Sequence, residues 1–208
     1  KKIFLKNKIL TPKYFNLSKN DYQKSILKKN FTKGKFKFPL VIKPVNEGSS
    51  LGVKIVTNFL DLKKTTNNLF KKYNQLIFEQ YIGGQEIQAS VINDKPLGAI
   101  ELIPKRTFYD YKAKYTKSAK TQHVMPARLK KNKYIEVLNL AKRAHRALKC
   151  RGVTRSDFKF YKNKFFLLEI NTQPGMTSLS LVPEIASYYK LNFNDLVETI
   201  LLDASLNK

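Results

Sequence analysis

The sequence has a single cysteine, few acidic residues and no long apolar run, and each scarcity excludes a class of protein. The lone Cys150 cannot form an intrachain disulfide or a CxxC metal site, which is typical of a reducing cytosolic compartment. No apolar stretch approaches the roughly 20 residues that span a bilayer, and lysines interrupt the first ten residues, where a secretory signal would need a continuous apolar segment. We therefore expect a soluble, cytoplasmic protein that does not associate with membranes.

The charge balance is strongly basic. The 208 residues include 40 Lys and Arg against 15 Asp and Glu, a formal net charge of +25, which suggests binding to nucleic acid or another anionic surface. Nearly all of the excess is lysine, scattered singly or in pairs, and only six residues are arginine. Because specific readout of nucleic acid generally uses arginine and a concentrated basic stripe, nucleic-acid binding is not expected as the main function. A basic binding module stays an alternative.

The apolar pattern predicts an α+β chain with a buried core, since 42% of the residues are hydrophobic. Helices are expected near residues 18–29 (with Ser18 as N-cap), 59–73, 133–148, 180–188 and 193–205. Strands are expected at 38–44, 53–57, 75–82, 86–93, 97–103, 153–161 and 164–170. Gly83 and Gly84 form a hinge that predicts two subdomains, 1–84 and 85–208. Residues 104–128 lack periodicity, and loops of that length are generally functional.

Because acids are scarce, Glu169 at the end of the apolar run "FFLLE" is informative. Residues two apart in a strand share a face, so Glu169 lies with Asn171, and Arg155 lies with Asp157 on the preceding strand. If the connecting turn has three residues, Asp157 lies directly opposite Glu169 on one face; a turn of two residues would place them on opposite faces. Facing carboxylates repel unless a cation lies between them, and hard divalent cations prefer oxygen ligands.

Asp157, Glu169 and Asn171 are therefore candidate magnesium ligands, with Arg155 near enough to bind an anion. The alternative is that Glu169 is an exposed strand end paired with a lysine. Directly after these residues, "NTQPGMTS" predicts a turn at Pro174 and Gly175 that frees backbone N–H groups, and such groups bind oxyanions. A metal site, an arginine and free amides together indicate phosphate chemistry.

Two further segments fit a nucleotide. "VIKPVNEGSSLGVK" lacks the P-loop pattern, but the amides of its glycine-bearing tip could cover a triphosphate, and Lys43 could reach the phosphates as a point charge. "LIFEQYIGGQE" ends a strand at a glycine hinge, where the edge offers backbone groups to an adenine and Glu86 could bind ribose hydroxyls. The alternative interpretation of these segments is an ordinary turn with glutamates exposed to solvent. His123 and His145 lack the spacing of a zinc site.

In this order, the segments "VIKPVNEGSSLGV", "FEQYIGGQE", "TFYDYKAKY", "RSDF" and "LLEINTQPGMTSLSLVP" resemble the D-alanine-D-alanine ligase family of the ATP-grasp superfamily. They span residues 39 to 183. The resemblance implies an ATP-grasp fold, in which two α+β subdomains hold the nucleotide site between two antiparallel sheets. It also implies that residues 104–128 form a lid that excludes water.

The resemblance implies a role for each matching residue. Residues implied to bind ATP are Lys43, Glu47, Gly48, Ser49, Ser50, Glu79, Gln80, Tyr81, Ile82, Glu86, Phe108 and Lys114. The implied metal ligands are Asp157, Glu169 and Asn171. Residues implied to act in catalysis are Ser49, Lys114, Arg155 and Gly175, and those implied to hold the substrates are Tyr115, Arg155, Gly175, Ser180 and Leu181. Gln80 departs from the family, since many members carry a lysine there.

The implied activity is ATP-dependent joining of two D-alanine molecules for peptidoglycan, through an acyl phosphate, with Mg²⁺ or Mn²⁺, two ions being expected. Family members also have an N-terminal domain that binds the first D-alanine, so a chain beginning at Lys1 is interpreted as a fragment of a protein that forms a homodimer. Two alternatives stay open. One is a related D-alanine-D-lactate or D-alanine-D-serine ligase, and the other is a basic anion-binding or nucleic-acid-binding module that keeps the fold.

Overall fold

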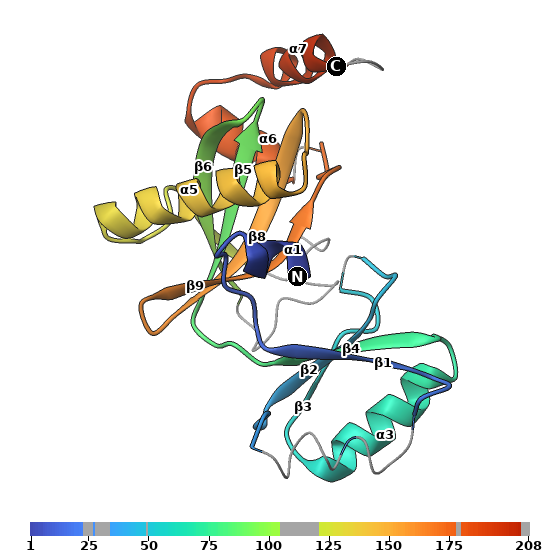
Figure 1. Cartoon of the computed structure of the whole chain (residues 1–208). Helices are drawn as coiled ribbons and strands as arrows, with labels where there is room; N and C mark the ends of the chain where they lie inside the picture. The colour runs from blue at the N-terminus through green and yellow to red at the C-terminus, as the bar shows by residue number, and fades with distance from the viewer. Residues whose placement is uncertain (23–26, 28–33, 49, 105–120, 178–179, 205–208) are drawn as a thin grey trace. The chain divides into compact units, whose positions relative to one another are not determined.

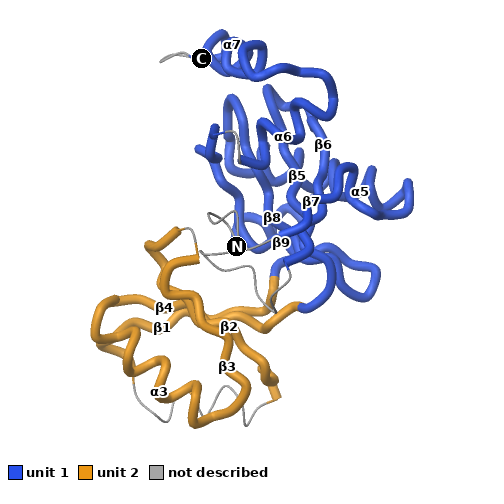
Figure 2. Tube along the Cα trace, turned by 180° about the vertical axis from the view of Figure 1, so that it is seen from behind, with its two compact units in different colours: residues 1–11, 83–108, 113–208 blue, residues 12–82, 109–112 orange. Residues whose placement is uncertain are grey.

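The computed structural model describes residues 1–22, 27, 34–48, 50–104, 121–177 and 180–204, and the chain divides into two compact units (Figure 1, Figure 2). Unit 2 begins at Pro12 and ends at Ile82, whereas unit 1 contains residues 1–11 and the described residues from Gly83 onward. The change of unit after Ile82 lies beside the predicted glycine hinge. Residues 1–11 differ from the predicted assignment to the first subdomain, because Phe4 and Ile9 are buried in the core of unit 1.

In its described part, unit 2 is a four-stranded antiparallel sheet packed against one helix (Figure 1). The sheet order is β1 (Tyr14–Ser18), β4 (Gln75–Gln80), β2 (Leu40–Pro44) and β3 (Lys54–Val56), and the helix is α3 (Phe59–Phe70). Leu40, Ile42 and Phe78 are fully buried in one cluster with Leu62 of α3. Alternate residues of β2 and β4 therefore point to the opposite face, away from α3.

The strands and the helix predicted in unit 2 between residues 38 and 82 are confirmed, whereas β1 was not predicted. The predicted helix at 18–29 falls largely outside the described residues. Ser18 instead ends β1, although its hydroxyl accepts a hydrogen bond from the backbone N–H of Asp21 at 3.1 Å, a contact typical of an N-cap serine. At α3, Asn58 is the N-cap, and its side chain accepts a bond from the N–H of Asp61 at 2.8 Å.

The described residues of unit 1 contain a five-stranded antiparallel sheet. Its order is β7 (Gln122–Val124), β6 (Lys95–Ile103), β5 (Gln85–Ile92), β8 (Val153–Tyr161) and β9 (Lys164–Asn171). The helices formed by the described residues of the unit are α1 (Lys2–Lys6), α5 (Lys131–Ala147), α6 (Leu181–Tyr188) and α7 (Phe193–Asp203). None of the helices in the described ranges has the length and apolar character that crossing a bilayer requires. Strand β7 lies within the predicted loop 104–128 and was not predicted.

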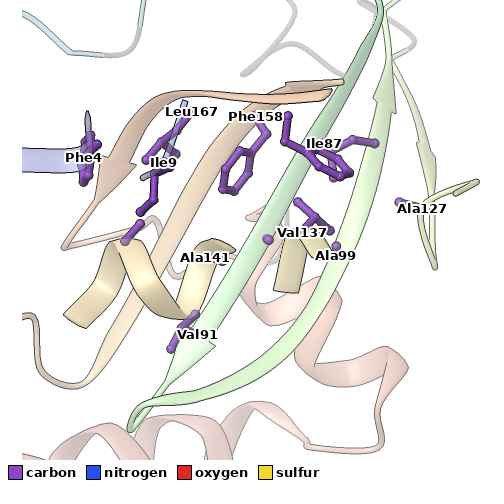
Figure 3. Packing of buried hydrophobic residues seen from close by; sticks show 13 residues of the cluster. Phe4, Ile9, Ile87, Val91, Ala99, Ala127, Val137, Ala141, Phe158 and Leu167 are labelled. Carbon is purple, nitrogen blue, oxygen red and sulfur yellow. The ribbon is translucent and has the colours of Figure 1, made fainter. Parts of the chain in front are cut away.

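Helices pack on both faces of this sheet. On one face, Val137 and Ala141 of α5 lie in a buried cluster with Ile87 and Phe158 of the central strands (Figure 3). The opposite face carries α6, because Val182 clusters with Ile92 and Val153, and a Cβ on Gly98 would lie 2.9 Å from the side chain of Ile185. Helix α6 thus covers one end of that face, and polar residues follow along the same strands.

The β8–β9 hairpin pairs Asp157 with Glu169, but its turn is shorter than the three residues on which that pairing was predicated. Its turn has two residues, Lys162 and Asn163, with φ of 47° and 61°, as in the two-residue turns that suit hairpins. Tyr161 therefore pairs with Lys164, and this register would oppose Asp157 to Leu168. A β-bulge adds Leu168 to β9, because Phe158 pairs with Leu167 whereas Asp157 pairs with Glu169. The bulge compensates for the short turn and restores the register that a three-residue turn would have given.

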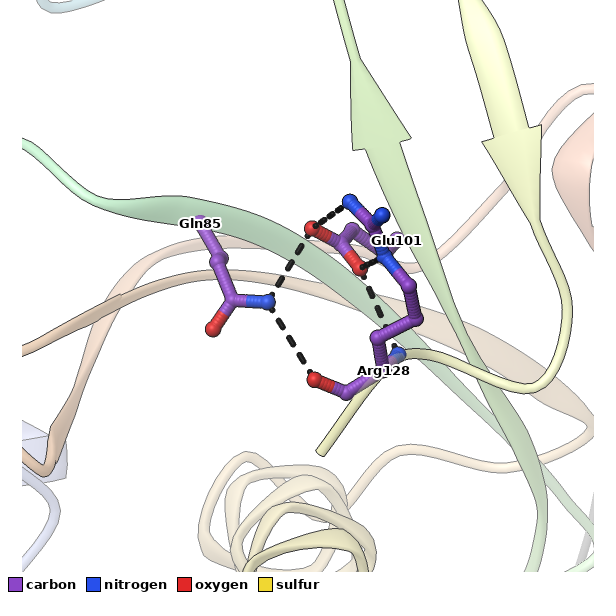
Figure 4. A network of polar contacts seen from close by, with 3 residues as sticks. All are labelled: Gln85, Glu101 and Arg128. Carbon is purple, nitrogen blue, oxygen red and sulfur yellow. Dashed lines mark hydrogen bonds and ion pairs between the residues drawn. The ribbon is translucent and has the colours of Figure 1, made fainter. Parts of the chain in front are cut away.

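A buried carboxylate links β5, β6 and the segment before α5 (Figure 4). Glu101 is 3% exposed and accepts bonds from Nε of Arg128 at 3.0 Å, from its Nη2 at 3.2 Å and from its backbone N–H at 3.3 Å. Gln85 donates to the same carboxylate at 3.0 Å. Burial raises the pKa of Glu101, but the bonds from Arg128 and Gln85 outweigh it, so the pKa lies below its ordinary value of 4.5.

This network should make the fold sensitive to acid. Because the pKa of Glu101 is lower in the folded chain than in the unfolded chain, the unfolded chain binds protons first as the pH falls. The stabilisation is complete above about pH 4.5 and is lost as the pH falls through the folded pKa. Glu101→Gln should remove this dependence and cost about 1.5–3 kcal/mol at pH 7. Urea denaturation between pH 3 and 7 measures both; an unchanged pH profile in the variant would contradict the assignment.

Candidate functional site

The polar face of the unit 1 sheet brings together residues that are far apart in the sequence. In one row, Gln88 of β5 pairs with Asp157 of β8, which pairs with Glu169 of β9. In the next row, Arg155 of β8 pairs with Asn171 of β9. Cross-strand partners share a face, so the carboxylates of Asp157 and Glu169 project to the same side as Arg155, opposite α5.

Arg155 and Asp157 form the centre of this face. The guanidinium donates from Nε to Oδ1 of Asp157 at 2.8 Å and from Nη2 to Oδ2 at 3.1 Å, a two-point contact that fixes both side chains. Asn171 donates to Oδ2 of Asp157 at 3.4 Å. Asp157 is 5% exposed, whereas Glu169 lies on the exposed edge strand. The arrangement places a buried cation–anion pair beside an accessible carboxylate.

The three predicted metal ligands have the donor chemistry of a magnesium site. Asp157 and Glu169 offer carboxylate oxygens, and Asn171 offers an amide oxygen, all hard ligands of the kind that Mg²⁺ prefers. Asp157 and Asn171 already lie within 3.4 Å of one another through their polar side-chain atoms. The described residues contain no cluster of three or more His, Cys, Asp or Glu side chains, so a zinc-type centre has no ligand set there. The residues present fit a hard divalent cation.

Glu86, the residue predicted to bind ribose, lies on the same face two residues before Gln88. Its carboxylate accepts a bond from Nζ of Lys159 at 2.9 Å, and Lys159 is its cross-strand partner on β8. Both side chains are more than four-fifths buried, at 13% and 18% exposure. Lys159 also shares the face of Asp157, and its pairing with Glu86 holds the glutamate in place.

The loop before α6 carries the predicted substrate residues. Ser180 is the N-cap of α6, yet its hydroxyl contacts Thr177 instead of its own helix, accepting from the Thr177 backbone N–H at 3.0 Å. A Cβ on Gly175 would lie 2.8 Å from that same hydroxyl, so a larger residue there would displace the hydroxyl from its present position. Gly175 and Ser180 therefore lie together, next to the backbone N–H of Leu181 in the first turn of α6. Such an end of a helix favours a carboxylate.

Unit 2 holds the predicted phosphate-binding lysine. Lys43 of β2 lies on the sheet face away from α3, and its Nζ is 3.1 Å from Oε1 of Glu79 on β4. The glutamate side chain is 3% exposed and the lysine 20%, so the charge of Lys43 compensates a buried carboxylate while its end reaches the surface. Two residues predicted to bind ATP are thus in direct contact.

Gln80 uses its side chain to hold the backbone. Its amide nitrogen donates to the carbonyls of Lys37 at 2.8 Å and Pro39 at 3.0 Å, and its oxygen accepts from the N–H of Lys37 at 3.1 Å. The next residue, Tyr81, donates its backbone N–H to the Pro39 carbonyl at 3.2 Å, and Ile82 follows at the end of the unit. The side chain of Gln80 therefore orders the segment before β2, a role that a lysine could not fulfil, since lysine has no acceptor.

The remaining predicted residues are described only in part. Glu47 and Gly48 are exposed in the turn between β2 and β3, and Ser50 has φ of 63°. The N–H of Leu51 donates to the carbonyl of Gly48 at 2.9 Å, so this amide closes the turn. The predicted residues Ser49, Phe108, Lys114 and Tyr115 lie outside the described residues, as does most of the predicted lid.

Two polar features of this face were missed by sequence reasoning. Gln88 contacts both Arg155 and Glu86, and the period-two alternation from Glu86 could have revealed it. His123 of β7 contacts Glu184 of α6, with Nδ1 at 2.6 Å from Oε2. No spacing in the sequence links those two residues, because strand β7 was not predicted.

Known proteins resemble this chain in sequence and in fold. Residues 3–202 match a family model described as the D-ala D-ala ligase C-terminus. The chain is 52% identical over its full length to a D-alanine–D-alanine ligase of Pelagibacter ubique, of which it covers 67%. It matches the crystal structure of the Bacillus anthracis D-alanine–D-alanine ligase complexed with ATP at a TM-score of 0.79 and 30% identity, covering 97% of this chain and 63% of the other.

A third match is the VanG D-Ala:D-Ser ligase of Enterococcus faecalis, with a TM-score of 0.83 and 26% identity over 96% of this chain and 58% of the other. The chain therefore spans about two thirds or less of the length of these proteins. The two antiparallel sheets of the structure match those of the ligases, as the predicted α+β ATP-grasp fold requires.

Proposed function

Because the chain belongs to the family of D-alanine–D-alanine ligase C-terminal domains, we propose that it binds ATP and carries the ATP-dependent chemistry of such a ligase. The observation that carries the proposal is the face on which Arg155, Asp157, Glu169 and Asn171 meet, because the bulge at Leu168 places Glu169 and Asn171 on the same face as Asp157 and Arg155. The predicted phosphate lysine Lys43 supports it from the other unit.

The proposed reaction has two steps. The carboxylate of one D-alanine attacks the γ-phosphorus of ATP, which forms an acyl phosphate and releases ADP. The amine of a second D-alanine then attacks the acyl carbon, and the dipeptide forms as phosphate leaves and the amine loses a proton. Both steps concentrate negative charge, first on the phosphoryl oxygens and then on the oxygen of the tetrahedral carbon, so fixed positive charge and amide donors stabilise them.

Residues of both units have a proposed role in these two steps. Lys43 binds the phosphates as a point charge, and Glu79, Tyr81 and Ile82 border the adenine. Glu86 binds the ribose hydroxyls. Lys114 and Ser49 were assigned to the phosphates by resemblance and keep that proposed role.

In unit 1, Arg155 stabilises the oxygen of the tetrahedral intermediate together with the N–H of Gly175. Ser180 and the N–H of Leu181 hold the carboxylate of the second substrate, and Tyr115 is proposed to contact substrate as well. Asp157, Glu169 and Asn171 would hold Mg²⁺ or Mn²⁺, which supplies charge neutralisation for the phosphates when it is bound. The carboxylates' own part is to keep Arg155 and the cation site side by side.

The second substrate is proposed to bind at the loop before α6. D-serine is a second candidate, because the chain is similar to a D-Ala:D-Ser ligase. The α6 N-terminus would bind the carboxylate of D-serine as well as that of D-alanine. The whole protein is further proposed to act in peptidoglycan synthesis in the cytoplasm as a homodimer, as the family resemblance implies. Phosphate release with D-alanine, D-serine or D-lactate as second substrate distinguishes the candidates.

Calorimetric titration of the 208-residue chain with ATP, with and without magnesium, tests the nucleotide site. We expect saturable binding that requires magnesium and changes little between about 0.1 and 0.3 M salt. A basic surface that attracts phosphates only by its overall charge would instead lose affinity log-linearly with salt concentration. Its affinity for ATP would not depend on magnesium. That outcome would replace the ligase proposal with the anion-binding alternative.

A further inference from the structure

Gln88 lies at the point where two groups of proposed site residues meet. It is 2% exposed, on the polar face of β5. Its Oε1 accepts a bond from Nε of Arg155 at 3.1 Å, and its Nε2 donates to Oε1 of Glu86 at 3.4 Å. Both ends of the amide are thus used within the site, one toward the proposed oxyanion cation and one toward the proposed ribose carboxylate.

These bonds complete a continuous line of contacts across the sheet. Asn171 contacts Asp157, Asp157 contacts Arg155, and Arg155 contacts Gln88. Beyond Gln88, the line continues to Glu86 and to Lys159 at 2.9 Å. Among the described contacts, Gln88 is the link between the half that contains the proposed metal ligands and the half that contains the proposed ribose ligand.

The chemistry of an amide suits this position. A guanidinium carries its donors in a rigid planar fork, so acceptors on two neighbouring strands, Asp157 on β8 and Gln88 on β5, define the plane of Arg155. Asp157 is also a proposed cation ligand and has other demands on its oxygens. The neutral oxygen of Gln88 binds Nε without cancelling the positive charge that Arg155 needs to stabilise an oxyanion.

We propose that Gln88 is a positioning residue, which holds the guanidinium of Arg155 in its working orientation and couples it to Glu86. Its consequence for catalysis rests on the proposed ligase function. The contact itself is independent of that function, so the two can fail separately.

The contact can be tested by NMR of the arginine Nε–H groups in the 208-residue chain. The sequence has six arginines, and Arg155→Lys identifies the signal of Arg155. The single Nε–H of Arg155 is shared between Asp157 at 2.8 Å and Gln88 at 3.1 Å. Gln88→Met keeps the size of the side chain and leaves only the bond to Asp157, so solvent exchange of the Arg155 Nε–H should accelerate by up to about tenfold. An unchanged Arg155 signal in this variant would overturn the proposal.

Gln85→Met is the matched control, because it makes the same change on the same strand. Gln85 bonds to Glu101 and to the Arg128 carbonyl on the other side of the sheet, so its loss should move the Arg128 signal and leave that of Arg155 unchanged. Gln88→Glu keeps an acceptor for Nε but brings a second carboxylate beside Glu86. It should therefore retain the slow exchange of Arg155 while weakening ATP binding.

Steady-state kinetics of the whole protein test the consequence of the contact for catalysis. Gln88→Met should lower kcat by about tenfold to a hundredfold and change the KM for ATP and D-alanine by less than about threefold, since orientation matters most in the transition state. Gln85→Met should lower the melting temperature and leave kcat unchanged. Equal losses of kcat in both variants would indicate a merely structural role. Absence of ligase activity in the unchanged protein would refute the proposed function and leave the NMR result to decide the contact.

Discussion

Replacing Lys43 with methionine is expected to weaken magnesium-dependent binding of ATP by about a hundredfold. Lys43 presents a compact charge at the end of a buried strand, with 20% of its side chain exposed, and a bond to a charged group contributes about 1.5–3 kcal/mol. Methionine keeps the apolar stem of the lysine and removes only the ammonium group. Calorimetric titration with ATP and magnesium measures the affinity directly.

The same substitution should also lower stability, because Glu79 is 3% exposed and loses the cation beside it. We expect a cost of about 2–3 kcal/mol, somewhat less than for a fully buried ion pair. The double variant Lys43→Met with Glu79→Gln removes the buried charge and should restore most of the stability. If it also restored ATP affinity, the loss in the single variant would reflect unfolding, and Lys43 would not bind phosphate.

Lys54→Met is the matched control for charge. Lys54 is an exposed residue of β3 in the same sheet, and its removal changes the net charge by the same amount. ATP affinity should stay within about twofold of the unchanged chain, because interactions between exposed charges are largely screened at physiological salt. An equal loss of affinity in both variants would show that the chain attracts ATP through its overall charge.

The sequence was sufficient to predict which residues of β8 and β9 share a face, but not how they come into register. The alternation of apolar and polar residues in "RSDF" and "FFLLEIN" placed Asp157 and Glu169 correctly. The turn length could not be predicted, because Lys162 and Asn163 are not the glycine-containing pair typical of two-residue turns, and nothing marks Leu168 as a bulge. Two deviations of one residue compensate, so the prediction reached the right pairing from the wrong turn.

Elements that depend on distant partners were the ones missed. Strand β1 pairs with β4 from the other end of unit 2, and its side chains alternate only weakly between buried and exposed positions. Strand β7 has three residues, and it exists because β6 offers it an edge. Residues 1–11 were assigned to the first subdomain for the same reason. Phe4 and Ile9 complete a core whose other members lie beyond residue 86.

Gln80 illustrates a residue whose role the family pattern obscured. The resemblance marked it only as a departure from lysine, whereas its side chain makes three bonds to the backbone of residues 37 and 39. The carboxamide offers a donor and an acceptor at once, so it can bind both the N–H and the carbonyl groups of the segment before β2, whereas a lysine could only donate. A contact of this kind joins positions 43 residues apart and leaves no local signal in the sequence.

Glu169→Gln is expected to remove the magnesium dependence of ATP binding. The amide keeps the shape of the side chain but loses the negative charge that would balance a divalent cation, so ATP affinity in magnesium should fall by at least about tenfold. Because Glu169 is exposed on an edge strand, the folded structure should keep its stability to within about 0.5 kcal/mol. This separates the metal role from the structural role of the buried Asp157, whose loss would also release Arg155.

Glu198→Gln on α7 provides the control, since it removes one negative charge from the same unit at a distance in sequence from the polar face. Titration of each variant with ATP at increasing magnesium should give a flat response for Glu169→Gln and an unchanged response for Glu198→Gln. Full magnesium dependence in Glu169→Gln would instead mean that the carboxylate is an exposed strand end paired with a lysine. The facing carboxylates would then owe their register to the Asp157–Arg155 pair, and the cation site would have to be sought elsewhere.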